Sequence, residues 1–188
     1  MKRQFAIGLG VAAVILTIPF ASKLPAVSGL FNSDVAIAKA AQHPKVQLNL
    51  VGEKQVLGKD AQGKETISWQ GGDKLVAQTG DVLRYRLMGK NEGDRSIKNL
   101  TLTQPVPQGT VLILKSAKAD ASQATRITYS IDGGRSFVEA PTVQVKLANG
   151  KVETRPAPAE VYTHVRWNLP GTLAAKAPVN AEYQVKVR

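Results

Sequence analysis

Residues 80–109 read GDVLRYRLMGKNEGDRSIKNLTLTQPVPQG, and this stretch decides the fold. Leu83, Tyr85 and Leu87 alternate with arginines, which is the period of two that lets a β-strand bury one face and expose the other. Turn-forming residues follow at 91–94. A second alternating run then ends in a corner rich in proline and glycine, which cannot continue a central strand. The stretch predicts two strands of an antiparallel sheet, and it predicts no chemical activity.

The chain beyond residue 45 shows the same alternation. Further runs of this kind cover residues 46–50, 127–131, 143–147, 161–169 and 181–187. Asp132-Gly133-Gly134 and Asn149-Gly150 are strong turn signals between them. Turn signals about 8–12 residues apart are typical of a β-sandwich or a barrel.

Two local expectations follow from composition and phase. Residues 117–124 are small and polar, so we expect a loop there. Val161, Val165 and Trp167 share one phase of the late run, so we expect all three on the buried face of one strand.

The N-terminus has the sequence pattern of an export segment. Lys2 and Arg3 precede a charge-free apolar run of 19 residues, 4–22, the pattern that the secretion machinery reads. This length lies between a signal-peptide core and a membrane-spanning helix. Small residues that suit a cleavage site occur at 26–28, 36–38 and 38–40.

We therefore expect residues 1–40 to be a cleaved signal peptide, or a retained single-span membrane anchor, followed by a linker. A hydrophobic export or anchor helix would then precede a domain made of residues 41–188. In both cases the positive-inside preference places that domain outside the cytoplasm. The protein would contact a membrane only through an uncleaved N-terminal segment.

The composition restricts the choice of partner. The chain has 188 residues, no cysteine, two histidines and a net charge of +11. It therefore lacks a disulfide framework and thiolate ligands for zinc. The surplus of positive charge favours nucleic acid, anionic lipid headgroups or acidic polysaccharide as partners. Export argues against nucleic acid, because an exported protein rarely meets a genomic target.

The chain also resembles a known family over most of residues 75–188. Gly80-Asp81 opens a strand with Tyr85 at its centre, the strand ends at Asn91 with Gly93 beyond it, and the corner reads Val106-Pro107-Gln108-Gly109. Later matches are Trp167, Leu173 and the closing run 181–187. These residues resemble the conserved-repeat family of bacterial surface proteins known as domain of unknown function eleven.

The resemblance implies an immunoglobulin-like antiparallel β-sandwich, found in envelope or outer-surface modules that share no catalytic residues. It implies that Tyr85 packs in the core, that Asn91 and Gly93 form a turn, and that Pro107 and Gly109 form a corner. The chain departs from the family at Gln104-Pro105 and at residues 116–150, which read as an inserted strand and hairpin.

The residues whose side chains could take part in catalysis or bind a metal have ordinary structural interpretations. His43 and His164 lack the sequence motif of a nucleophile or paired acid that catalysis would need. The loop after Asp132 continues with Arg135 and Ser136, and it lacks the alternating oxygen ligands of a calcium loop. We expect no catalytic, cofactor or metal site, and a hydrolase is a remote alternative.

The candidate binding residues are cations and one tryptophan. The outward phase of the strands carries the candidate polyanion-binding residues Arg84, Arg86, Lys90, Arg166, Lys186 and Arg188. If the sheet brings them together, they could hold an anionic polymer; the competing interpretation is a solvated face. Trp69 lies between polar residues and is the candidate exposed aromatic.

The sequence thus predicts an all-β, non-enzymatic, exported structural or interaction module of the bacterial cell envelope or surface. Its location would be the periplasm, the outer surface or the medium, with anchoring in the inner membrane as one form. Its partners would be envelope or surface proteins, and the alternative function is binding of anionic glycan or lipid headgroups through a basic sheet face. Exposed edge strands could also pair with a strand of another protein.

Overall fold

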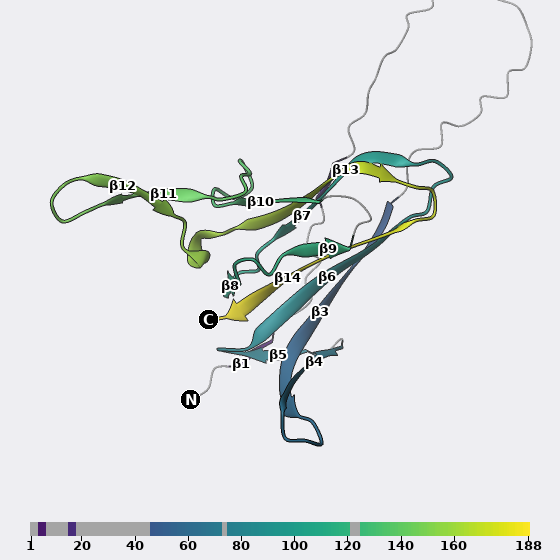
Figure 1. Cartoon of the computed structure of the whole chain (residues 1–188), viewed down its shortest axis with the longest axis horizontal. Helices are drawn as coiled ribbons and strands as arrows, with labels where there is room; N and C mark the ends of the chain where they lie inside the picture. The colour runs from purple at the N-terminus through teal and green to yellow at the C-terminus, as the bar shows by residue number, and fades with distance from the viewer. Residues whose placement is uncertain (1–3, 7–14, 18–45, 73–74, 121–124) are drawn as a thin grey trace, which may run out of the picture.

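The computed structural model describes residues 4–6, 15–17, 46–72, 75–120 and 125–188 (Figure 1). Within these ranges every named strand pairs antiparallel with its neighbour, and no α-helix occurs. The all-β prediction is confirmed. Two sheets form the body of the molecule, an arrangement consistent with a β-sandwich.

The larger sheet has six strands in the order β4-β3-β6-β14-β8, with β9 pairing another part of β14. The strands are β3 (Val46–Lys59), β4 (Glu65–Gly71), β6 (Val82–Asn91), β8 (Thr110–Leu112), β9 (Lys118–Asp120) and β14 (Pro178–Val187). The long strands β6 and β14 pair at the centre of this sheet.

The smaller sheet has four strands in the order β10-β13-β7-β2. The strands are β2 (Ile15–Thr17), β7 (Ile97–Pro105), β10 (Arg126–Ser130) and β13 (His164–Leu173). Figure 1 shows β7, β10 and β13 as one layer and β3, β6 and β14 as another. The remaining elements are β1 (Gln4–Ala6), β5 (Val76–Gln78), β11 (Thr142–Lys146), β12 (Val152–Pro156) and the 3₁₀ helix η1 (Ala159–Val161).

The core lies between the two sheets. Leu83, Tyr85 and Leu87 of β6 are buried together with alternate residues of β14, as the period of two predicts. From the smaller sheet, Val165 and Trp167 join the same hydrophobic cluster. The rings of Trp167 and Tyr183 are 6.0 Å apart between centroids, so the two sheets meet there.

The expected hairpin at Asn149-Gly150 is present and projects from the body as an arm made of β11 and β12 (Figure 1). Gly150 has a φ of +80°, which a residue with a side chain adopts at a cost. The Asn149 side chain accepts a hydrogen bond from the Lys151 amide at 3.1 Å. These contacts close the turn as the sequence predicts.

Two local predictions were wrong. Residues 118–120, expected in a loop, form β9, because β14 is long enough to offer free backbone groups beside β8. Val161, expected on the buried face of a strand, ends η1 and is 36% exposed. Its amide bonds the Pro158 carbonyl at 3.2 Å, and the regular strand begins only at His164.

The expected N-terminal export or anchor helix lies largely outside the described residues. Of the first 45 residues, only the two short strands β1 and β2 are described. In the described part of the chain, the structure has no helix with the length and hydrophobicity needed to cross a membrane.

Asn91 closes the end of β6, and it does more than form a turn. The side chain is fully buried. Its Nδ2 donates to the carbonyls of Arg95 at 2.8 Å and Ala174 at 3.0 Å, and its Oδ1 accepts from the Gly93 amide at 3.1 Å. Because Ala174 lies between β13 and β14, this one side chain joins the end of β6 to the loop that links the two sheets.

We expect Asn91→Ala to lower the free energy of unfolding by about 2–4 kcal/mol, because the carbonyls of Arg95 and Ala174 would lose their donor and the fully buried Asn91 side chain would leave a gap. Urea unfolding followed by tryptophan fluorescence measures this change. Asn149→Ala is the matched control, since Asn149 is exposed and serves only the arm, and its expected cost is below about 1 kcal/mol. Equal losses in the two variants would contradict a linking role for Asn91.

Candidate functional site

The outer face of the larger sheet carries the first part of the expected basic surface. In β6 the core-facing residues alternate with Arg84 and Arg86, which point to the opposite side. The phase predicted from the sequence therefore holds. The pairing of β6 with β3 and β14 decides what these arginines meet, because each lies opposite a residue of a neighbouring strand.

Glu53 of β3 binds both arginines. It lies directly opposite Arg84 in the strand register. One carboxylate oxygen of Glu53 is 2.7 Å from Nη2 and 2.7 Å from Nε of Arg84, so the contact is bidentate on the guanidinium side. The other oxygen lies 3.6 Å from Nη1 of Arg86. The Glu53 side chain is only 15% exposed, so this carboxylate is held inside the charge cluster.

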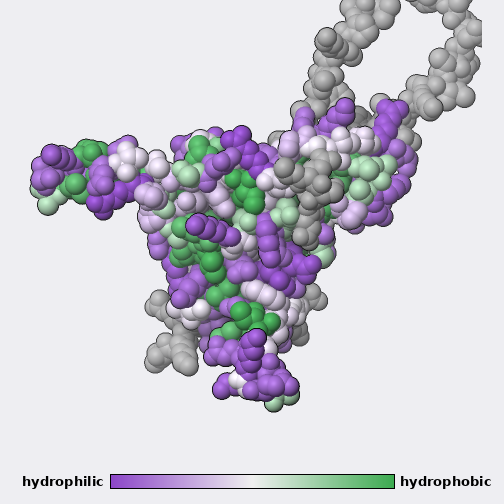
Figure 2. Space-filling view, in the orientation of Figure 1, coloured by the Kyte–Doolittle hydropathy of each residue, from purple (hydrophilic) through white to green (hydrophobic). Residues whose placement is uncertain are grey.

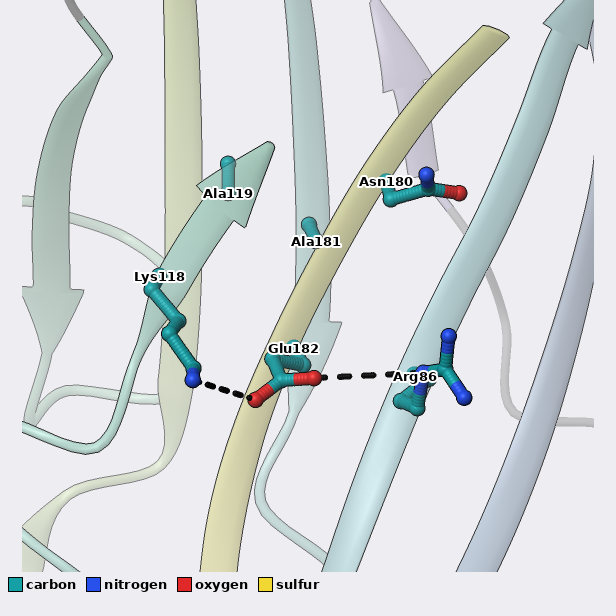
Figure 3. A pocket seen from close by; sticks show the side chains of 6 residues that line it. All are labelled: Arg86, Lys118, Ala119, Asn180, Ala181 and Glu182. Atoms are coloured by element: carbon teal, nitrogen blue, oxygen red, sulfur yellow. Dashed lines mark ion pairs between the residues drawn. The ribbon is translucent and has the colours of Figure 1, made fainter. Parts of the chain in front are cut away.

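Glu182 of β14 extends the cluster toward β9 (Figure 3). Its carboxylate lies 3.8 Å from Nε of Arg86 and 3.1 Å from Nζ of Lys118. These residues, with Asn180, Ala119 and Ala181, line a hollow of about 20 Å³. A volume of this size holds about one water molecule, so the hollow does not enclose a sugar or a phosphate group.

We name Arg84, Arg86, Lys118, Glu53 and Glu182 the cross-strand charge cluster. Three cations share two carboxylates across β3, β6, β14 and β9, so the formal net charge of the cluster is +1. Most of the attraction that these cations could offer an anionic polymer is already directed at carboxylates of the same sheet.

Trp69 belongs to the same outer face. The Arg84 guanidinium lies 4.2 Å from the centroid of the Trp69 ring, a cation–π contact. The indole is partly buried rather than fully exposed. One face of the ring is thus covered by an arginine that also binds Glu53. A sugar could stack only on the other face.

Lys90, Lys186 and Arg188 lie outside the cross-strand charge cluster. Lys90 lies 3.1 Å from Glu92 at the end of β6. Lys186 is exposed on β14, and Arg188 donates to the carbonyls of Thr110 at 3.2 Å and Glu160 at 3.3 Å. By the β6–β14 register, Lys90 and Lys186 lie on the same outward face as Arg84 and Arg86, but of the six predicted residues only Arg84 and Arg86 share a carboxylate.

Arg166 lies on the smaller sheet, on the opposite layer of the molecule. Its guanidinium covers the ring of Phe137, 3.4 Å from the centroid, and its Nε donates to the Thr103 hydroxyl at 3.0 Å. Strand β13 pairs with β7 in the smaller sheet, so Arg166 does not lie on the outer face of β6. A single basic patch made of all six predicted residues does not form.

Asp132 serves its own turn. Its carboxylate accepts hydrogen bonds from the Ser130 hydroxyl at 2.7 Å, the Ser136 hydroxyl at 2.5 Å, and the amides of Arg135 and Ser136, each at 3.0 Å. The bonds from Ser136 are the main reason that the pKa of Asp132 lies well below its usual range. The turn closes where Tyr129 bridges Val138.

His164 packs beside this turn. Its Nδ1 lies 3.1 Å from the Thr163 hydroxyl oxygen, and its ring meets Phe137 edge-on. Burial and the nearby Arg166 lower the pKa of His164, against a smaller opposing effect of Asp132. His43 lies outside the described residues. Across the described ranges, no cluster of three or more histidine and acidic side chains is arranged to hold a metal ion.

The carboxylates Glu53 and Glu182 are the residues that sequence reasoning missed. The expected first strand ended at residue 50, whereas β3 continues to Lys59 and brings Glu53 opposite Arg84. The alternation of the closing strand places Glu182 on the outward face, but the sequence does not show which residues of other strands lie beside it. Only the strand order shows which charges share a surface.

Replacing Glu53 tests the cluster. Glu53→Gln leaves the partly buried Arg84 guanidinium without its anion and leaves Arg86 with Glu182 alone, so we expect the free energy of unfolding to fall by about 1–2 kcal/mol. Glu153→Gln is the control, because the Glu153–Arg155 pair is half exposed and worth less than about 0.5 kcal/mol. Chemical denaturation measures both. If the Glu53 variant is as stable as the Glu153 variant, the cross-strand charge cluster does not contribute to the stability of the fold.

Comparisons with known proteins add no identification. No protein-family model, no curated protein and no solved structure matches the chain. The resemblance of residues 75–188 to a family of surface proteins therefore stays a prediction from the sequence. Function has to be inferred from the residues themselves and from how the fold uses them.

Proposed function

We propose that this chain is an exported, non-enzymatic module with an immunoglobulin-like β-sandwich, and that it acts in the bacterial cell envelope or at the cell surface as a structural or interaction domain. Export is supported by the basic start and apolar run of residues 1–22. The immunoglobulin-like assignment is supported by two packed antiparallel sheets with a shared aromatic core.

The observation that carries the proposal is that the residues behind the family resemblance, such as Tyr85, Asn91 and Pro107, make structural contacts within the fold. Tyr85 is buried and stacks on Tyr183 with ring centroids 5.4 Å apart. The buried Asn91 side chain donates hydrogen bonds to the carbonyls of Arg95 and Ala174. At the corner, Pro107 accepts bonds from the Thr110 amide at 3.2 Å and the Thr110 hydroxyl at 2.7 Å. Residues that could be taken for a site are thus engaged in holding two sheets together.

The two polar side chains that could in principle take part in catalysis, Asp132 and His164, support a binding role over catalysis. Asp132 accepts four hydrogen bonds within its turn, so its carboxylate is not directed at an external substrate. His164 contacts Thr163 and Phe137 of the same region. A catalytic base would need a nucleophile or substrate proton in reach, and these two side chains are engaged locally.

Binding of anionic glycan or lipid headgroups is the less supported alternative. It requires cations that are free to turn toward a ligand. Arg84 and Arg86 instead bind Glu53, and Arg166 lies on the other sheet. Exposed Lys186 and the overall charge of +11 provide a general attraction to polyanions without a defined site.

Cell fractionation with N-terminal sequencing tests the proposal. We expect the protein outside the cytoplasm, beginning after residue 28, 38 or 40 if a signal peptide is cleaved, or retaining Met1 in the membrane fraction if the segment is an anchor. In the anchored form, protease added to the outside of spheroplasts should digest the β-sandwich. Intact protein in the cytosol with Met1 in place would contradict the proposal.

A further inference from the structure

Strand β4 forms an edge of the larger sheet. Its neighbour in the sheet is β3, and among the described strands none pairs with its other side. The β3–β4 hairpin runs past the end of the packed core to the lower end of the molecule (Figure 1). In β4 all residues except the partly buried Trp69 are exposed. Within the described residues, the outer backbone groups of β4 therefore have no strand partner.

Exposed hydrophobic side chains lie along this edge of the sheet. Ile67 is 59% exposed and Leu57 is 70% exposed, and the two lie directly opposite each other in the β3–β4 register. Trp69 is two residues along β4 and so lies on the same face as Ile67. Figure 2 shows hydrophobic surface beside a hydrophilic tip at the lower end, where the hairpin lies. We name Leu57, Ile67 and Trp69 the edge strip.

The sequence of β4 lacks the usual protection of an edge strand against pairing. Natural edge strands are shortened, charged with lysine, interrupted by proline or covered. The sequence of β4, ETISWQG, has neither lysine nor proline, and its one charge is at the first position. By contrast β8 and β9 have three residues each, and β10 is followed by a turn that folds back onto it.

We propose that β4 pairs antiparallel with β4 of a second copy of this chain, about a two-fold axis at Ser68, so that two larger sheets become one continuous sheet. In this register Ile67 faces Trp69 of the second copy, and Thr66 faces Gln70 of the second copy. Glu65 faces Gly71 of the second copy. The contact is isologous, because the same residues serve both sides.

The register follows from the side chains. Centring on Ser68 places Ile67 and Trp69 of both copies on one face, where Leu57 of each copy extends the apolar surface. No charged residue meets a like charge across the pair. Centring on Ile67 would instead place Glu65 opposite Trp69, and centring on Trp69 would leave Ile67 opposite Gly71. Both alternatives lose the isoleucine–tryptophan contact.

The contact should be weak and favoured by salt. An edge of seven residues buries less than the roughly 1,000 Å² expected of a stable interface, so the monomer and dimer should exchange. Two chains of charge +11 repel each other at low ionic strength. Screening reduces that repulsion and leaves the hydrogen-bonded and apolar contact in place. Salt would oppose, by contrast, a contact based on the cross-strand charge cluster.

A single cysteine gives a direct test, because the chain has none of its own. Ser68→Cys places two thiols opposite each other, and facing residues of an antiparallel pair have Cα atoms about 4.5–5.5 Å apart, within disulfide range. We expect the purified full chain, under mild oxidation, to form a covalent dimer that increases with protein concentration and with salt. Ala148→Cys at the exposed end of the arm is the matched control and should stay largely monomeric.

The apolar requirement is tested in the same background. Ile67→Lys added to Ser68→Cys should reduce the covalent dimer at least tenfold, since a lysine would face Trp69 of the second copy. Val152→Lys, a change of similar size at a residue 63% exposed on the arm, should leave the dimer unchanged. Far-ultraviolet circular dichroism checks that every variant keeps its β-structure.

Three results would overturn the inference. The first is a Ser68→Cys chain that forms no more dimer than the Ala148→Cys control. The second is resistance of the thiol introduced by Ser68→Cys to a maleimide reagent in the monomer, which would mean that the chain itself covers β4. The third is a crosslink in cells to a different protein in place of the second copy. The contact goes beyond the proposed function and is independent of export, so fractionation and crosslinking can fail separately.

Discussion

Tyr183 joins three parts of the molecule through one buried side chain. Its ring stacks on Tyr85, which lies directly opposite in the β6–β14 register, with an interplanar angle of 22°. Across the core it contacts Trp167 of the smaller sheet. Its hydroxyl donates to the Pro105 carbonyl at 2.9 Å, at the end of β7. Burial raises the pKa of Tyr183, so the hydroxyl keeps its proton and remains a donor.

This arrangement fixes the phase of the strands. A shift of one residue would turn Tyr85 or Tyr183 to the outside and bring an arginine or a glutamine into the core. The positions of Arg84, Arg86 and Glu182 on the outer face follow from the same constraint. Asn91 holds the far end of β6 in the corresponding way, through hydrogen bonds in place of aromatic packing. The motif-like residues are therefore committed to the scaffold, which leaves the outer faces and the strand edges for recognition.

Much of the scaffold was predictable because it depends on local alternation. Leu83, Tyr85 and Leu87 showed their burial in a period of two, and Asn149-Gly150 showed its turn through backbone chemistry. Trp167 was also expected in the core and is fully buried. Each of these inferences needs only a few neighbouring residues.

The surface was less predictable because it depends on strand order. The contact between Glu53 and Arg84 joins residues 31 apart in the chain. Whether Arg166 shares a face with Arg84 depends on which sheet takes β13. Trp69, the candidate exposed aromatic, is partly buried, and the arginine that covers one face of its ring could not be inferred from its sequence neighbours. The exposed side of β4 likewise becomes visible only when the sheet is assembled.

Native-state hydrogen exchange tests most directly whether Tyr183 and Asn91 join the two sheets into one cooperative unit. The account predicts that backbone amides paired within β6, β13 and β14 exchange only through global unfolding, with one shared free energy and one shared denaturant dependence. Amides of the β11–β12 arm should exchange through local opening at lower free energy. Exchange from β13 that proceeds independently of β6 and β14 would contradict the account, because the sheets would then separate without unfolding.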